Sequence, residues 1–220
     1  MNDQNAYGFN PEAINRTISN IKTRFNELDK NLGDGISRVF SKLADNWFAP
    51  EAIDFYDHAR EKIFTVYRID IVGNYSGFMN LFQASCNKWA ETVGSDFRVS
   101  LNLQDEPARS IPYTDFKASN SNGFVGVYEQ NISDINRDFD SALNQLSEDI
   151  TKMVQAIKTD PSLYGAAQLD AFENCVKNWQ GKVARIFTEI FNEMTTKINQ
   201  TREKYQSTAQ ANAQRFASGN

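Results

Sequence analysis

The chain has 220 residues and a net charge of −5, with one histidine and two cysteines. So few ligands exclude a structural zinc site, which needs four cysteines or two cysteines and two histidines, and a framework of several disulfides. A single bridge between Cys86 and Cys175 is conceivable, but we expect two unpaired, buried thiols. No basic patch indicates nucleic-acid binding. No run approaches the roughly 18 apolar residues of a membrane span, and residues 1–10 lack the pattern of a signal peptide.

The first predicted helix covers residues 11–44. Asn10 is a suitable N-cap, and Pro11 suits the first helical position. Apolar residues then recur at steps of three and four: Ile14, Ile18, Ile21, Phe25, Leu28, Leu32, Ile36, Val39, Phe40 and Leu43. This spacing is typical of one face of an amphipathic helix. Gly33 and Gly35 interrupt the stripe without changing its phase, so we predict one long helix that could bend at the glycines.

The second predicted helix covers residues 50–92, after a short break at residues 45–50 in which Pro50 suits a helix start. Its core candidates are Ala52, Phe55, Ala59, Ile63, Val66, Phe78, Leu81, Phe82 and Trp89. Residues 71–77 contain two glycines, and this composition predicts a kink or a break in the middle of the helix.

Residues 93–127 change character. Phe97, Val99, Leu101 and Leu103 alternate with polar residues, as in a strand. Turn-forming residues follow at positions 119–123, before a second short apolar run. We expect either a small β-hairpin or an extended linker packed on the helices.

Helical spacing resumes from Tyr128 and stops at Pro161. The apolar positions are Ile132, Ile135, Phe139, Leu143, Leu146, Ile150, Met153 and Ile157. A short helix is predicted over residues 163–176, and a last helix from Trp179 to about residue 214.

The two halves repeat a pattern. Ile18, Ile21, Phe25, Leu32 and Ile36 match, at a shift of 114 positions, Ile132, Ile135, Phe139, Leu146 and Ile150. At a shift of 132, Trp47, Ala49, Ala52 and Phe55 match Trp179, Gly181, Ala184 and Phe187. We interpret this as a duplicated helix-turn-helix hairpin, residues 1–92 and 128–220, with residues 93–127 between the copies.

The repeated Trp-x-small-x-x-Ala-x-x-Phe pattern has a structural interpretation. A small residue two positions after the tryptophan permits a tight turn or a close helix approach, and the tryptophan covers the junction. Alanine and phenylalanine then continue one face of the following helix. Core packing is the default interpretation of these positions, and partly exposed tryptophans that contact another protein are the alternative.

Trp179-Gln180-Gly181 resembles the Trp-x-Gly motif of the WXG family, the ESX-like substrates of type VII secretion, whereas Trp47-Phe48-Ala49 has alanine in place of glycine. The resemblance implies hairpins that pair antiparallel into four-helix bundles. It also implies export without a cleaved signal peptide, and a role as a secreted partner, escort or effector. The Tyr-x-x-x-Asp/Glu export signal of that family is absent, since Tyr205 is followed four residues later by Ala209.

No sequence pattern predicts a catalytic, cofactor-binding or metal-binding site. A catalytic histidine needs a nucleophile and an orienting group, and the sole histidine, His58, has neither in a recognisable motif. Asp54, Asp57 and Glu61 share a helix face but lack the second histidine of a metal-binding bundle, so we expect a solvated face. We therefore expect no catalytic residue, no cofactor and no metal.

The sequence thus predicts an all-α protein: an elongated four-helix bundle of two hairpins with a short β-like or extended insertion. The expected function is a non-enzymatic protein–protein interaction module that a type VII system could export. Its partner would be secretion machinery, a cognate helical protein, an effector or a second copy. The expected location is outside the cell, or the cytoplasm before export. The alternative is a structural or scaffold protein, for example a virion component, in which the tryptophan pattern is only packing.

Overall fold

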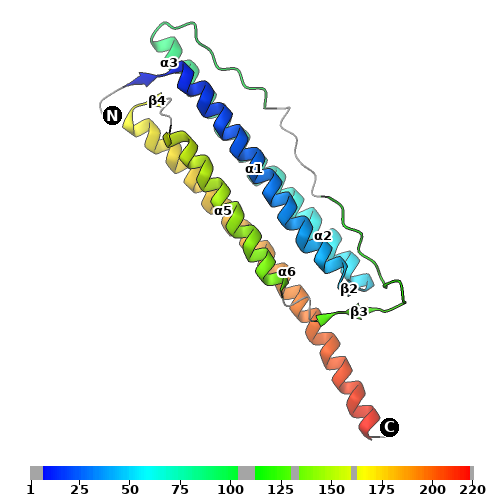
Figure 1. Cartoon of the computed structure of the whole chain (residues 1–220). Helices are drawn as coiled ribbons and strands as arrows, with labels where there is room; N and C mark the ends of the chain where they lie inside the picture. Colours follow the sequence, from blue (N-terminus) through cyan, green and yellow to red (C-terminus); the bar gives the residue numbers. More distant parts are fainter. Residues whose placement is uncertain (1–6, 104–111, 130–133, 160–162, 219–220) are drawn as a thin grey trace. The chain divides into compact units, whose positions relative to one another are not determined.

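The computed structural model describes residues 7–103, 112–129, 134–159 and 163–218, and these residues form an all-α protein (Figure 1). The all-α prediction is confirmed. The helices are α1 (Pro11–Ala44), α2 (Pro50–Val66), the π-helical η1 (Tyr67–Val72), α3 (Gly73–Thr92), α5 (Ile135–Thr159) and α6 (Ala166–Ser218). The strands, of two residues each, are β1 (Gly8–Phe9), β2 (Trp47–Phe48), β3 (Gly126–Val127) and β4 (Leu163–Tyr164).

The chain divides into two compact units. Unit 1 contains Met1–Leu32, Thr65–Ser110 and Asn144–Ile186, and unit 2 contains Gly33–Phe64, Ile111–Leu143 and Phe187–Asn220. Helices α1, α2, α5 and α6 contribute residues to both units. Each unit therefore draws helical segments from both predicted hairpins.

Helix α1 has the predicted bounds, and its start has a clear local cause. The side-chain oxygen Oδ1 of Asn10 accepts hydrogen bonds from the backbone N–H groups of Glu12 and Ala13, each at 3.1 Å. This N-cap satisfies two donors that the first helical turn leaves without partners. In unit 1 the apolar stripe packs on α3, where the rings of Phe25 and Tyr75 stack with centroids 3.8 Å apart.

The predicted weak point of the second helix is a π-helical segment. The chain passes from α2 through η1 into α3 without leaving helical geometry, and the backbone N–H of Gly73 donates to the carbonyl of Arg68, five residues earlier. A wider turn of this kind inserts one residue into an α-helix. The prediction of a kink or break at residues 71–77 is therefore replaced by a continuous helix with a π turn at residues 67–72.

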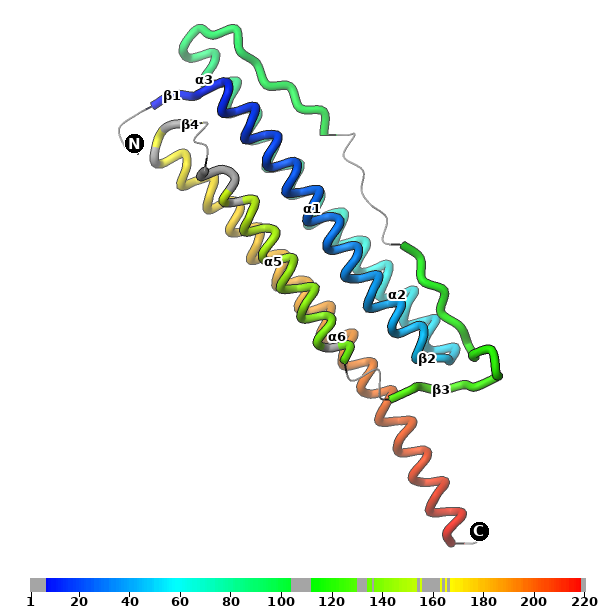
Figure 2. The backbone as a smooth tube through the Cα atoms, viewed as in Figure 1, coloured from blue at the N-terminus to red at the C-terminus, as the bar shows by residue number. Residues whose placement is uncertain are grey.

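The part of the segment after α3 that the structure describes next, residues 95–103, is extended, as one of the two alternatives for residues 93–127 predicts, whereas residues 104–111 lie outside the described residues (Figure 2). Side chains of α3 hold it in unit 1. The side-chain amide of Asn87 accepts from the backbone N–H of Val99 at 2.7 Å and donates to its carbonyl at 2.9 Å. Oε1 of Gln83 accepts from the backbone N–H of Leu101 at 2.6 Å. The helix thus supplies the hydrogen bonds that a neighbouring strand would otherwise make.

The short strands pair reciprocally between the two halves of the chain. In unit 1, β1, which precedes α1, pairs antiparallel with β4, which precedes α6. In unit 2, β3 pairs antiparallel with β2, which joins α1 to α2. Within the described residues, β3 thus pairs with the turn of the first half rather than with a strand of its own segment.

The predicted second turn is wrong. A short helix over 163–176 followed by a separate helix from Trp179 was expected, but α6 is one helix of 53 residues, and Trp179-Gln180-Gly181 lies inside it. The reason is that a single glycine in a helix interior costs only about 1 kcal/mol, which a long packed helix tolerates. The second turn lies instead near β4. At the shift of 114 positions that matches α1 to the second half of the chain, Trp47-Phe48 matches residues 161–162, directly before β4. Ile132 and residues 160–162 themselves lie outside the described residues.

Alanine at position 181 is expected to raise the free energy of unfolding by about 0.5–1 kcal/mol. A Cβ atom at Gly181 would meet no other atom within 4 Å, so the substitution adds helix propensity without a clash. Gly35 is the matched contrast, because its added Cβ would lie 3.2 Å from Cβ of Ala142 in unit 2. We expect Gly35→Val to cost about 1–3 kcal/mol. Urea unfolding measures both, and a destabilising Gly181→Ala would show that the glycine of the motif is structurally required.

Candidate interaction site

Trp179 is a core residue of unit 1. It is 6% exposed, and its indole Nε1–H donates to the backbone carbonyl of Asp70 in η1 at 2.7 Å. The carboxylate of Asp70 in turn forms an ion pair with Lys182 at 2.6 Å. The π turn thus provides the carbonyl that accepts from the indole N–H, and the ring itself is buried inside unit 1. Core packing, the default interpretation, describes Trp179.

The other three residues of the second Trp-x-small-x-x-Ala-x-x-Phe pattern lie inside α6 and do not form a turn. Gly181 is exposed, Ala184 is half-buried, and Phe187 is fully buried in unit 2, where its ring lies edge-on to Phe191 with centroids 5.7 Å apart. Because all three continue α6, they extend a helix face and do not build a junction between helices.

Trp47 lies where the sequence predicted it, between α1 and α2 in unit 2. It is 2% exposed, and its ring centroid is 5.3 Å from that of Phe55. Ala49 and Ala52 are fully buried, and the backbone N–H of Ala52 donates to the carbonyl of Ala49 as α2 begins. The indole Nε1 of Trp47 is buried and has no hydrogen-bond partner among the described residues. This is the main chemical difference between the two tryptophans.

Trp47 also lines a pocket of unit 2. The pocket has a volume of about 440 Å³, within the range of about 300–1,000 Å³ that is typical of binding sites for small groups. Its apolar lining consists of Trp47, Phe55, Ala59, Ile190 and Met194. Its polar lining consists of Glu51, Asp54, His58, Lys62, Glu193, Lys197 and Thr201. The pocket therefore joins β2 and α2 to a stretch of α6 that is more than a hundred positions away in the sequence.

Two of the acidic residues in the pocket are already paired. Glu193 forms an ion pair with Lys62, and the hydrogen bond from that ammonium group lowers the pKa of the Glu193 carboxyl. Glu51 accepts a hydrogen bond from the hydroxyl of Tyr205 at 2.7 Å. Burial, together with this hydrogen bond, raises the pKa of Tyr205 to about 12. In the part of the chain that the structure describes, the side chains of Asp54 and Lys197 form neither a hydrogen bond nor an ion pair.

His58 and its acidic neighbours are placed as surface residues. His58, Asp57 and Glu61 are exposed on α2, as the solvated-face interpretation predicts. Only His58 and Asp54 of this group reach the pocket. Across the described ranges, no group of three or more His, Cys, Asp or Glu side chains is placed to hold a metal ion.

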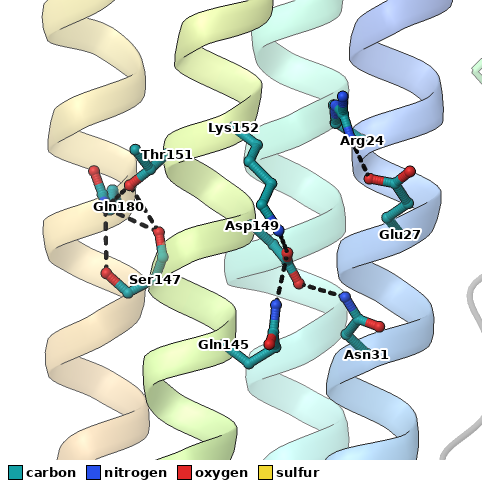
Figure 3. Close-up of polar contacts among 9 residues, drawn as sticks. All are labelled: Arg24, Glu27, Asn31, Gln145, Ser147, Asp149, Thr151, Lys152 and Gln180. Atoms are coloured by element: carbon teal, nitrogen blue, oxygen red, sulfur yellow. Dashed lines mark hydrogen bonds and ion pairs between the residues drawn. The ribbon is translucent and has the colours of Figure 1, made fainter.

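A buried carboxylate in unit 1 is part of a polar contact between α1 and α5 (Figure 3). Asp149 is 2% exposed and accepts hydrogen bonds from Asn31 at 2.8 Å and from Gln145 at 3.0 Å. Lys152 forms an ion pair with it at 3.1 Å. A buried carboxylate with this many partners is satisfied in place and stabilises the packing of the two helices.

The middle residue of Trp179-Gln180-Gly181 makes a second contact in the same unit. The side-chain amide of Gln180 donates to Oγ1 of Thr151 at 3.0 Å and to the carbonyl of Ser147 at 3.2 Å, which ties α6 to α5 (Figure 3). The motif that resembles Trp-x-Gly therefore serves helix packing through both its tryptophan and its glutamine.

The end of α6 is the feature that sequence reasoning missed. The face of α6 that is buried in unit 2 continues in phase beyond the packed region; in order it comprises Phe187, Phe191, Met194, Ile198, Thr201, Tyr205, Ala209, Asn212 and Phe216. Every residue from Gln206 to Ser218 is exposed, and Phe216 is 87% exposed. Figure 1 shows this segment, in red, extending past β2 and β3. The signal was present as the unbroken spacing of three and four residues up to Phe216.

The two cysteines differ in accessibility, which corrects the expectation of two buried thiols. Both are free, but Cys86 is buried and Cys175 is exposed. Burial raises the pKa of the Cys86 thiol from 9.0 to about 12. We expect excess iodoacetamide to alkylate only Cys175 in the folded protein and both thiols after unfolding, as counted by mass spectrometry. Rapid loss of both thiols in the folded protein would contradict the buried placement of Cys86.

The raised pKa of Cys86 also predicts that the stability of the fold depends on pH. The unfolded chain releases the thiol proton near pH 9, whereas the folded chain keeps it until about pH 12. The folded state therefore binds more protons in this window, and the free energy of unfolding falls as the pH rises through it. Cys86→Ala is expected to flatten this part of the profile, and an unchanged slope would contradict the assignment.

The described residues thus define an all-α helical-bundle protein with a pocket in unit 2 and an exposed end of α6. None of the helices in the described part of the chain combines the length and apolar character that a membrane crossing requires. Comparisons with protein-family models, with curated proteins and with solved structures give no match for this chain.

Proposed function

We propose that this chain is a non-enzymatic protein–protein interaction module that recognises its partner through the end of α6. One observation carries the proposal: the core-facing stripe of α6 continues in phase to Phe216, although residues 206–218 are exposed. Burying a phenylalanine side chain contributes about 1.5–3 kcal/mol, so a complex in which a partner's groove covers Phe216 is stabilised by about that amount. Proteins commonly recognise one another by laying such a helix face into a groove.

The composition of this segment suits a recognition helix. Four alanines, Ala209, Ala211, Ala213 and Ala217, give it high helix propensity. Because it continues a long helix, it also avoids the cost of nucleating a new one, which makes isolated helices of about 12–15 residues marginal in water. The segment can therefore stay helical and present Phe216 before a partner binds.

A narrower proposal is that the chain is WXG-like and exported by a type VII system. It is supported by Trp47-Phe48-Ala49, which lies between α1 and α2 at a hairpin junction. Trp179-Gln180-Gly181 lends it no support, because these residues lie inside α6. Co-expression with a type VII secretion ATPase tests it: protein in the medium is the expected result, and its absence would count against export.

Site-specific photo-crosslinking tests the interaction proposal. The photoreactive amino acid p-benzoylphenylalanine is placed at position 216 in the cells that produce the protein, and at position 211 as the control. Ala211 is also exposed but lies on the opposite face of α6. We expect one discrete adduct with a polypeptide from position 216 and none from position 211. The same adducts from both positions, or none from position 216, would overturn the proposal.

A further inference from the structure

The pocket of unit 2 has specific requirements for an occupant. Its apolar lining, which includes Phe55 and Met194, suits an aromatic or aliphatic side chain. Trp47 contributes its buried ring to this lining. Asp54 suits a cation, and Lys197 suits a group with negative character. An occupant of this pocket therefore combines an apolar side chain, a cation and a group with negative character.

The end of α6 carries each of the matching groups. Phe216 is an exposed aromatic ring, and the neighbouring Arg215 is an exposed cation. Backbone carbonyls in the last turn of a helix have no intrahelical N–H to accept from, so this end of α6 carries partial negative charge. The same helix end carries the negative pole of the helix dipole, which Lys197 favours. The helix ends at Ser218, within one turn of Phe216.

The helix end that fills the pocket must come from another molecule. Met194 lines the pocket and Phe216 lies 22 positions later on the same continuous helix. At a rise of 1.5 Å per residue this separation is about 33 Å, far beyond the reach of a side chain. A chain with an intact α6 therefore cannot place its own Phe216 in its own pocket.

We propose that the end of α6 from one copy docks into the unit 2 pocket of a second copy. Phe216 enters the apolar lining, Arg215 pairs with Asp54, and the C-terminal end of α6 approaches Lys197. This inference rests on the proposed function and identifies its partner as the chain itself. The occupant and the receptor are different surfaces, so the contact can be reciprocal in a closed pair or can continue from copy to copy.

Light scattering coupled to size-exclusion chromatography tests self-docking over a wide range of protein concentration. We expect the mass of the wild-type protein to rise above 25.0 kDa as the concentration increases. Phe216→Ala is expected to stay monomeric, whereas the control Gln214→Ala, on the opposite face of α6, should behave as the wild type. A wild-type protein that is monomeric throughout, or a Phe216→Ala variant that associates as the wild type does, overturns the inference.

A charge exchange tests the proposed orientation. Arg215→Glu and Asp54→Lys are each expected to weaken association at least about tenfold, and the double variant is expected to recover it to within about threefold of the wild type. Both residues are exposed, so the circular dichroism and thermal unfolding of the variants should match the wild type. Weakening by each single change without recovery in the double variant overturns the pairing of Arg215 with Asp54.

The self-docking inference and the proposed function fail in distinguishable ways. A strictly monomeric protein that still gives a discrete adduct from position 216 with a different polypeptide overturns self-docking and supports the interaction function. An adduct at twice the mass of the chain supports both. No adduct from position 216 together with a monomeric protein overturns both.

Discussion

Replacement of Trp179 by alanine is expected to lower the free energy of unfolding by about 3–5 kcal/mol. The indole is 6% exposed, and its N–H donates to the carbonyl of Asp70 in η1. The substitution removes a large buried ring and also leaves a carbonyl of the π turn with one partner fewer. Urea unfolding followed by circular dichroism measures the loss.

Two further variants separate the contributions of the ring and the hydrogen bond. Trp179→Phe keeps most of the apolar volume but removes the donor, so a loss of about 1–3 kcal/mol is expected. Trp89→Ala is the control, because Trp89 is only half-buried, although its Nε1–H also donates, to Gln168 at 2.9 Å. It should cost less than Trp179→Ala. A loss near zero for Trp179→Ala would mean that its ring is accessible and available to a partner.

Replacement of Tyr56 by alanine is the second change with a large expected effect, also about 3–5 kcal/mol. Tyr56 is fully buried in unit 2, with its ring edge-on to Phe40 at 4.9 Å and stacked on Phe116 at 4.6 Å. Its hydroxyl accepts a hydrogen bond from the backbone N–H of Thr114 at 2.7 Å. One side chain therefore joins α1, α2 and the extended segment around residues 112–116.

The loss of Tyr56 should release the extended segment as well as lower stability. In Tyr56→Ala, we expect hydrogen exchange at residues 112–116 to become faster than in the wild type. Tyr56→Phe keeps the ring and should cost only about 0.5–1.5 kcal/mol. The control is Tyr113→Ala, because Tyr113 is 64% exposed and contacts Tyr56 only by an edge. Unchanged exchange in Tyr56→Ala would contradict the anchoring role.

The helices were largely predictable because their signals are local. The N-cap at Asn10 and the stripe that begins at Ile14 define α1 within a few residues of chain, and the observed helix has the predicted bounds. The junction at Trp47 was predictable for the same reason, since Pro50 starts α2. The fully buried Ala49 and Ala52 fit the predicted core packing at this junction.

The second turn and the pocket were not predictable in this way. Trp179 and Gly181 resemble a turn motif only by residue type, and the packing of α6 against its neighbours keeps a glycine inside a helix. The pocket joins Asp54 on α2 to Lys197 on α6, so its existence depends on which helices lie side by side. The uncovered stripe at Phe216 was visible as spacing, but only the structure shows that it is exposed.

The sequence by itself determined that this chain is all-α, and where α1 begins and ends. Residue spacing and capping are properties of neighbouring residues, which the sequence displays directly. Only the tertiary structure decided that the indole N–H of Trp179 has an acceptor in Asp70 whereas that of Trp47 has none among the described residues. The reason is that burial and hydrogen-bond partners come from residues that are distant in the sequence.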